Sequence, residues 1–134
     1  MTRIAVDTSA LMAILQGEPD AEMFEHALLE SKGDAAITAA NLLEAMLVIE
    51  SRNPDTGAQD LRSLIDIFAI TIEAVTHDLA EIAFRAWTRF GKGRHSAALN
   101  YGDCFAYALA KHLDAPLLFK GDDFAQTDIL NALE

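Results

Sequence analysis

Carboxylates stand at four places in this chain where a globular protein of its size usually has apolar or capping residues. They are Asp7, Glu44, Asp103 and the pair Asp122 and Asp123. Oxygen ligands without clustered histidine or cysteine favour Mg²⁺ or Mn²⁺ over structural zinc. Such ions keep several waters and bind substrate phosphates, so the natural reaction of a site built from these side chains is hydrolysis of a phosphodiester bond.

The places of the acids along the chain indicate how they could converge. Asp7 lies between the apolar run Ile4–Val6 and a helical run, which is a strand-to-helix junction. Asp122 follows another apolar strand late in the chain. Because parallel strands gather their carboxyl ends along one edge of a sheet, these two side chains can meet there. Glu44 and Asp103 then need only face inward from their helices.

Strand-length apolar runs alternate with longer helical patterns along the whole chain. Strands are predicted at residues 3–6, 35–38, 70–72 and 117–119. Helices are predicted at residues 9–15, 21–31, 39–52, 56–68, 77–90 and 101–112. This β-α alternation predicts an α/β fold with a parallel sheet.

Each acid also has a purely structural interpretation. Asp7 could be a helix N-cap, and Asp103, in a first helical turn, could be no more than a partner of the helix dipole. Glu44 has no Lys or Arg within a turn of its helix, and an isolated buried carboxylate is costly. It could still form a long-range salt bridge or lie at an exposed helix edge. The ordered set of acids, rather than any one of them, favours a metal site.

Length and composition favour a single domain, residues 1–134, with a real core. Hydrophobic residues make up 51% of the chain and charged residues 23%, which argues against disorder. No stretch approaches the roughly 20 apolar residues of a membrane-spanning helix, and no basic leader precedes the first apolar run. The single cysteine, Cys104, cannot form an internal disulfide, so we expect the protein in the reducing cytoplasm.

The formal net charge of −11 weighs against broad nonspecific affinity for nucleic acid. A bound divalent ion would reverse that sign locally. The basic residues are also unevenly distributed, and one cluster comprises Arg85, Arg89, Lys92 and Arg94, with His95 alongside. This basic cluster either contacts RNA phosphates or is a solvated helix end, and the sequence leaves both interpretations open.

Four motifs carry a family resemblance: Ile4-Ala5-Val6-Asp7-Thr8-Ser9, Glu44 in its helix, Asn100-Tyr101-Gly102-Asp103, and Leu118-Phe119-Lys120-Gly121-Asp122-Asp123-Phe124. Together they resemble a PIN-domain ribonuclease and, more narrowly, a VapC-type toxin. The resemblance spans residues 3–129 and implies a three-layer α/β/α fold with a short central parallel sheet surrounded by helices. It also implies a metal site lined by catalytic residues Asp7, Glu44 and Asp103, with Asp122 as the fourth. Asp123 and Asp128 are alternatives for that fourth place.

The implied activity is that of an Mg²⁺- or Mn²⁺-dependent endoribonuclease acting as the toxin of a toxin-antitoxin pair. One or two ions would activate a water and neutralise charge on the phosphate. The implied partners are an RNA substrate, a cognate antitoxin that places a cation near the acidic pocket, and a second copy of the chain in a homodimer. Phe84, Trp87 and Phe90 are interpreted as core or dimer-contact residues, with base stacking as the alternative.

Two other classes of protein remain open. A phospho-receiver-type signalling module is also small and acidic, with aspartates at strand ends and a lysine, here Lys120, after a late strand. Its phosphorylated aspartate normally follows a central strand, however, and the runs at 35–38 and 70–75 end without one. A non-catalytic PIN-like interaction scaffold would keep the acids without cleaving RNA.

Overall fold

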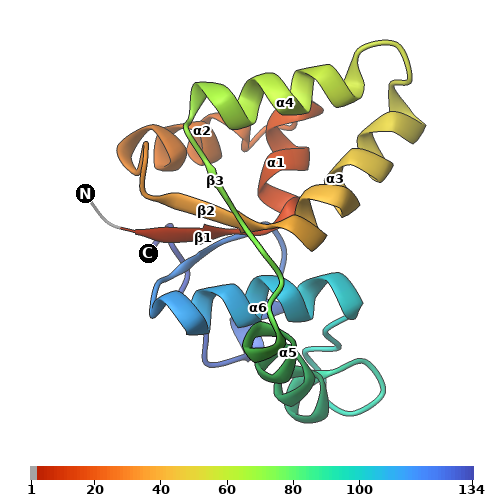
Figure 1. Cartoon of the computed structure of the whole chain (residues 1–134), viewed down its shortest axis with the longest axis vertical. Helices are drawn as coiled ribbons and strands as arrows, with labels where there is room; N and C mark the ends of the chain where they lie inside the picture. Colours follow the sequence, from red (N-terminus) through yellow and green to blue (C-terminus); the bar gives the residue numbers. More distant parts are fainter. Residues whose placement is uncertain (1–2) are drawn as a thin grey trace.

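The computed structural model describes residues 3–134 (Figure 1). Its elements in chain order are β1 (Ile4–Val6), α1 (Thr8–Leu15), α2 (Ala21–Glu30), β2 (Ala35–Thr38), α3 (Ala39–Arg52), α4 (Gly57–Ile67), β3 (Thr71–Glu73), α5 (His77–Phe90), α6 (Tyr101–Leu113), β4 (Leu117–Leu118) and the 3₁₀ helix η1 (Phe124–Gln126). Every strand and helix predicted from the sequence is present, and no predicted end differs by more than one residue. Such differences are within the fraying of element ends.

The four strands form one parallel sheet in the order β3-β2-β1-β4. Strand β1 therefore lies between β2, the next strand in the chain, and β4, the last strand in the chain. Ala5 of β1 aligns with Ala36 on one side and with Leu117 on the other. The chain order reverses at β1, so the carboxyl ends of β1 and β4 flank a topological switch point, where α/β proteins place their ligand sites.

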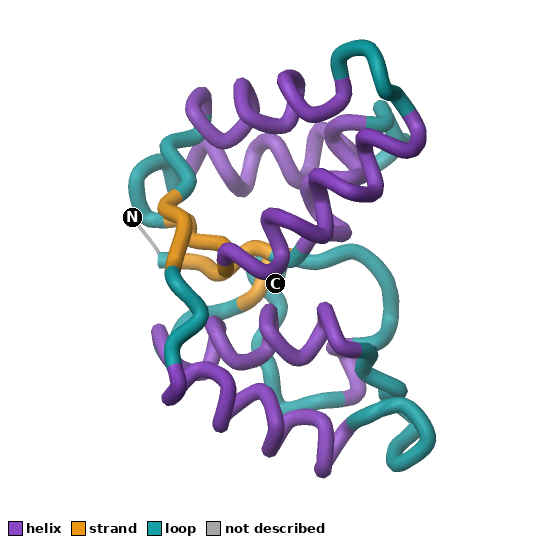
Figure 2. The backbone as a smooth tube through the Cα atoms, turned by 45° about the vertical axis from the view of Figure 1, so that its right-hand side comes forward, coloured by secondary structure: helices purple, strands orange, loops and turns teal. Residues whose placement is uncertain are grey.

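Helices cover both faces of the sheet and give the three-layer α/β/α arrangement (Figure 2). Helices α1 to α4 lie above the strands in Figure 1, and α5 and α6 lie below them. The alternation of side chains along each strand explains the two layers. Val6, Ile37 and Leu118 pack into the cluster under α1 to α4, whereas Ala5 and Leu117 pack into the cluster with α5 and α6.

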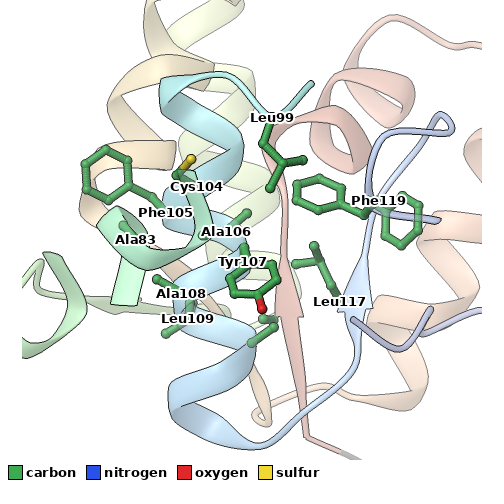
Figure 3. Packing of buried hydrophobic residues seen from close by; sticks show 14 of the residues in the cluster. Ala83, Leu99, Cys104, Phe105, Ala106, Tyr107, Ala108, Leu109, Leu117 and Phe119 are labelled. Atoms are coloured by element: carbon green, nitrogen blue, oxygen red, sulfur yellow. The ribbon is translucent and has the colours of Figure 1, made fainter. Parts of the chain in front are cut away.

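Helix α6 contains a long stretch of buried residues. Its seven consecutive residues from Cys104 to Ala110 are all buried. Figure 3 shows this stretch of α6 packed beside Leu117 and Phe119. A helix that is apolar all round must be covered on all sides, and here the sheet and α5 cover it. The position of Asp103, at the start of this helix, is therefore fixed by the core.

No helix in residues 3–134 is long and apolar enough to cross a membrane.

Candidate active site

Asp7 is buried directly after β1, as its place at a strand-to-helix junction predicts. It is the N-cap of α1, and its Oδ2 accepts hydrogen bonds from the Ser9 backbone N–H at 3.1 Å and from the Ser9 hydroxyl at 2.5 Å. The capping interpretation is thus confirmed, but it does not account for the burial of the side chain, which is 5% exposed. A carboxylate used only as a cap is normally solvated.

Ser9 joins Asp7 to the loop that follows β4. The Ser9 hydroxyl accepts a hydrogen bond from the Lys120 backbone N–H at 2.9 Å while it donates to Asp7. The Lys120 side chain points elsewhere, because its ammonium group pairs with Glu18 and Asp20. Ser9 therefore links Asp7 to the loop after β4, the strand that pairs with β1 at the switch point.

Glu44 reaches the same region from α3. Its Oε1 accepts hydrogen bonds from the Thr8 hydroxyl at 2.6 Å and from the Asn41 amide at 3.3 Å. Asn41 is fully buried, and its amide also donates to the Gly102 carbonyl at 2.9 Å. Its Oδ1 accepts from the Thr38 hydroxyl at 2.7 Å. Asn41 thus connects α3, α6 and the end of β2 around the Glu44 carboxylate.

Gly102 lets that carboxylate approach α6. A Cβ atom added at Gly102 would overlap the Glu44 carboxylate, with its carbon only 2.7 Å away. The backbone of Gly102 is an ordinary helical one, so its lack of a side chain serves the close approach and not the conformation of the chain.

Asp103 completes a capping box at the start of α6. Its Oδ2 accepts from the Asn100 backbone N–H at 3.0 Å, and Asn100 Oδ1 accepts from the Asp103 N–H at 2.8 Å. The structural interpretation of Asp103, as a partner of the N-terminus of its helix, therefore accounts for one oxygen of this carboxylate. The carboxylate is also close enough to the other acids for their charges to affect it.

Burial, assisted by the charges of Asp103 and Glu44, raises the pKa of Asp7 to about 7, even though the Ser9 hydrogen bonds oppose the rise. Burial likewise raises the pKa of Asp103 to about 6, opposed by the Asn100 N–H and assisted by the charges of Asp123 and Glu44. In residues 3–134 no Lys, Arg or His forms an ion pair with any of these four acids. Carboxylates with raised pKa and without a protein cation are typical of functional sites.

The three candidates for the fourth acid differ in their surroundings. Asp122 and Asp123 are both exposed in the turn after β4, and Asp123 is the one whose charge raises the pKa of Asp103. Asp128 lies farther along the chain, where it pairs with Lys111 and accepts a hydrogen bond from Tyr107. It braces the C-terminal segment against α6.

The donor set suits a hard divalent cation that keeps part of its water shell. Among the described residues no three acidic, histidine or cysteine side chains lie close enough to share one ion directly. Mg²⁺ is usually bound through one or two carboxylates together with waters and substrate phosphates, so the spacing fits this ion better than a closed structural site. Cys104 is buried, and burial raises the pKa of its thiol to about 11, which does not favour a nucleophile or a metal ligand.

Sequence reasoning missed three members of this arrangement. From the sequence, Thr8 is only part of the motif around Asp7, and neither Asn41 nor Gly102 has an assigned role. A signal was present for Asn41, because it precedes Glu44 by three residues and so shares its helix face. Gly102 carried no such signal, since its role depends on a contact with a residue far away in the sequence.

Asp7→Asn should stabilise the metal-free protein at neutral pH. The folded pKa of about 7 lies above the ordinary value of 3.8, so the folded state keeps a proton that the unfolded state loses. Wild-type stability should therefore fall as pH rises from about 4 to about 7 and stay low above that range. Each unit of difference between the folded and unfolded pKa corresponds to about 1.4 kcal/mol in the free energy of unfolding. The variant should lack this loss, and urea denaturation in EDTA across this pH range measures it.

Asp66→Asn is the matched control, because Asp66 is an exposed carboxylate on α4. It should follow the wild type at every pH. A stability advantage of Asp7→Asn that does not grow with pH would contradict the assignment.

Gly102→Ala should weaken binding of Mn²⁺ by roughly tenfold, because supporting contacts to a ligand typically change affinity by 10 to 100-fold. Alanine would otherwise favour the helix by about 1 kcal/mol, so the loss would not reflect unfolding. Calorimetric titration without RNA provides the measurement. In a Glu44→Ala background the same substitution should have no further effect, and an equal loss in both backgrounds would refute the proposed contact.

Comparison with known proteins supports the resemblance seen in the sequence. A model of the PIN domain matches residues 4–130. The chain is 48% identical over 126 residues to a VapC ribonuclease of Mycobacterium bovis and to ribonuclease VapC30 of Mycobacterium tuberculosis, covering 94% of this chain and 95% of each relative. It is 47% identical to ribonuclease VapC of Mycolicibacterium smegmatis, covering 94% and 97%.

Solved structures show the same fold. VapC20 of Mycobacterium tuberculosis, described as a sarcin-ricin loop cleaving toxin, superposes with a TM-score of 0.77 at 18% identity, covering 95% of this chain and 96% of that one. A toxin-antitoxin complex from Klebsiella pneumoniae gives 0.71 at 19% identity, covering 93% and 92%. The family match excludes the phospho-receiver alternative. With the acids placed at the switch point of its sheet, this chain belongs to the PIN-domain family and, within it, to the VapC proteins.

Proposed function

We propose that this protein is an Mg²⁺- or Mn²⁺-dependent endoribonuclease and the toxin of a toxin-antitoxin pair. The observation that carries the proposal is the convergence of Asp7, Glu44 and Asp103 from three separate elements without any protein cation to neutralise them. Its relatives of about 48% identity are named VapC ribonucleases. The proposed metal ligands and catalytic residues are these three acids together with Asp122 or Asp123.

The metal supplies Lewis-acid stabilisation of the phosphate and activates the attacking water when it is bound. The residues of the protein hold the acids in position. Ser9 holds one oxygen of Asp7 and Asn100 holds one oxygen of Asp103, which leaves the second oxygen of each available to a ligand. Thr8 and Asn41 hold Glu44 through its Oε1 in the same way, so Oε2 is the atom that could accept a proton from a water.

For the fourth acid, the charge of Asp123 on Asp103 favours Asp123 over Asp122. Both follow Gly121, whose φ of 106° turns the chain sharply after β4. Both are proposed, with Asp123 as the better supported.

The proposed partners are an antitoxin and a second copy of the chain. An antitoxin is supported by the structural relative that is a toxin-antitoxin complex and by the net charge of −11, which favours a basic segment near the acids. A homodimer is supported by exposed apolar side chains around two adjoining hollows that share Tyr101 and Phe105: Leu43, Leu47, Phe84 and Trp87. We expect the pair to act in the cytoplasm, where a lone thiol stays reduced.

Incubation of the purified protein with a mixture of cellular RNAs tests the activity. Cleavage should require Mg²⁺ or Mn²⁺, stop in EDTA and be reduced by at least about 100-fold in Asp7→Asn and Asp103→Asn, because each removes a metal ligand. Sequencing of the new RNA ends gives the cleavage site. Cleavage by wild type and Asp7→Asn at equal rates would indicate a contaminating nuclease or a non-catalytic scaffold.

Asp122→Asn and Asp123→Asn, assayed side by side in the same experiment, distinguish the two candidates. Both lie in one turn and lose the same charge, so each is the matched control of the other. The larger loss of cleavage is expected from Asp123→Asn.

A further inference from the structure

Positive charge is concentrated in one part of this acidic chain. Residues 85–111 contain five of the ten Lys and Arg residues but only one acid, Asp103. The rest of the chain is correspondingly more acidic than the net charge of −11 indicates. The segment covers the C-terminal part of α5, all of the loop before α6, and most of α6, so these cations lie on the α5 and α6 side of the sheet.

A hollow of about 470 Å³ lies between α5 and α6 on that side. Its cations come from both helices: Arg85, Arg89 and Lys111. Lys92 and Arg94 are in the loop instead, and the Arg94 guanidinium lies 4.3 Å from the centre of the Trp87 ring. The structure thus divides the basic cluster of the sequence and adds Lys111 to one half of it. We call Arg85, Arg89 and Lys111 the basic groove.

The basic groove already holds one anion, the carboxylate of Asp128. Lys111 Nζ lies 2.7 Å and an Arg89 nitrogen 3.5 Å from Asp128 Oδ2, and the buried Tyr107 hydroxyl donates to Oδ1 at 2.6 Å. Two cations and a hydroxyl therefore converge where an anionic oxygen can lie. Asp128 neutralises only part of the charge, because three cations line the groove.

Arg85 is the cation of the groove that makes no ion pair within residues 3–134. It is exposed one turn before Arg89, so the two side chains lie on the same face about 5 to 6 Å apart at Cβ. A solvated helix end explains Arg89, which is in the last turn of α5, but it does not explain Arg85.

We infer that the basic groove binds the phosphate backbone of the RNA substrate at a site separate from the catalytic acids. The inference rests on the proposed ribonuclease function. Lys111 and Asp103 are both in α6, eight residues apart, which corresponds to about 12 Å along the helix. An RNA strand that lies on the acids can extend over this distance. Because the acids repel RNA until metal binds, cations beside them supply attraction that the site itself lacks.

Binding of a fluorescent single-stranded RNA, longer than the roughly 4 to 16 nucleotides that one binding fold covers, tests the groove. The measurement uses the Asp7→Asn background, so that RNA is not cut, with Mg²⁺ present. Arg85→Glu should weaken binding by roughly three- to tenfold at low salt and lower the slope of log affinity against log salt by about 0.7 or more. Arg62→Glu is the matched control, since Arg62 is exposed on α4, on the opposite face of the sheet. It makes the same change in net charge.

Asp128→Asn should act in the opposite direction. Asparagine can still accept the Tyr107 hydrogen bond, while Arg89 and Lys111 lose the carboxylate that neutralises them. RNA binding should therefore become tighter and more dependent on salt. Weaker RNA binding by the folded Asp128→Asn variant would contradict the proposal that the basic groove binds RNA.

Three outcomes separate this inference from the proposed function. Equal binding by Arg85→Glu and Arg62→Glu, while wild-type protein cleaves RNA, would contradict RNA binding by the basic groove and leave the proposed ribonuclease function standing. Weaker binding by Arg85→Glu would support RNA binding by the basic groove even if wild-type protein did not cleave. Competition by poly-glutamate as strong as that by RNA would overturn the assignment of the ligand, because the groove would then recognise an acidic polypeptide.

Discussion

The pairing of β1 with β2 on one side and β4 on the other is the constraint on which the site depends. It places the first strand of the chain beside the last one, with their carboxyl ends at the same edge. Asp7 follows β1 with no intervening residue, so its burial is a direct result of this pairing. The Ser9 hydroxyl then accepts a hydrogen bond from the loop after β4 and so links that loop to Asp7.

Neutral groups, and not cations, hold the acids of the site in place. Hydroxyls, a side-chain amide and backbone N–H groups orient Asp7, Glu44 and Asp103 without removing their charge. Lysine or arginine in these positions would stabilise the fold more simply, because buried carboxylates are costly when unpaired. The protein instead leaves these carboxylates without a protein cation, and a divalent ion is the partner that they favour.

The sequence was sufficient for the elements and for the general location of the site, because both depend on local patterns. Strand and helix periods predicted every strand and α-helix, and Asp7 could be placed at a sheet edge from its position after Ile4–Val6. The contacts that orient Glu44 could not be predicted, because Gly102 and Thr8 are far from it along the chain.

Two further features also depended on the folded chain. Phe84 and Trp87 share a helical spacing with Phe90, yet only Phe90 is buried, and their role as dimer contacts stays a prediction. Which of Asp122 and Asp123 faces Asp103 depends on the geometry of one turn, for which a periodic pattern has no information.

Calorimetric titration of the RNA-free protein with Mn²⁺ near pH 6, in two buffers of different ionisation enthalpy, tests the central claim most directly. If repulsion and burial keep a proton on Asp7 and Asp103, binding of the ion should release roughly one proton. Asp7→Asn should release less and bind more weakly. Binding without proton release, or binding that Asp7→Asn does not change, would contradict the account of this site.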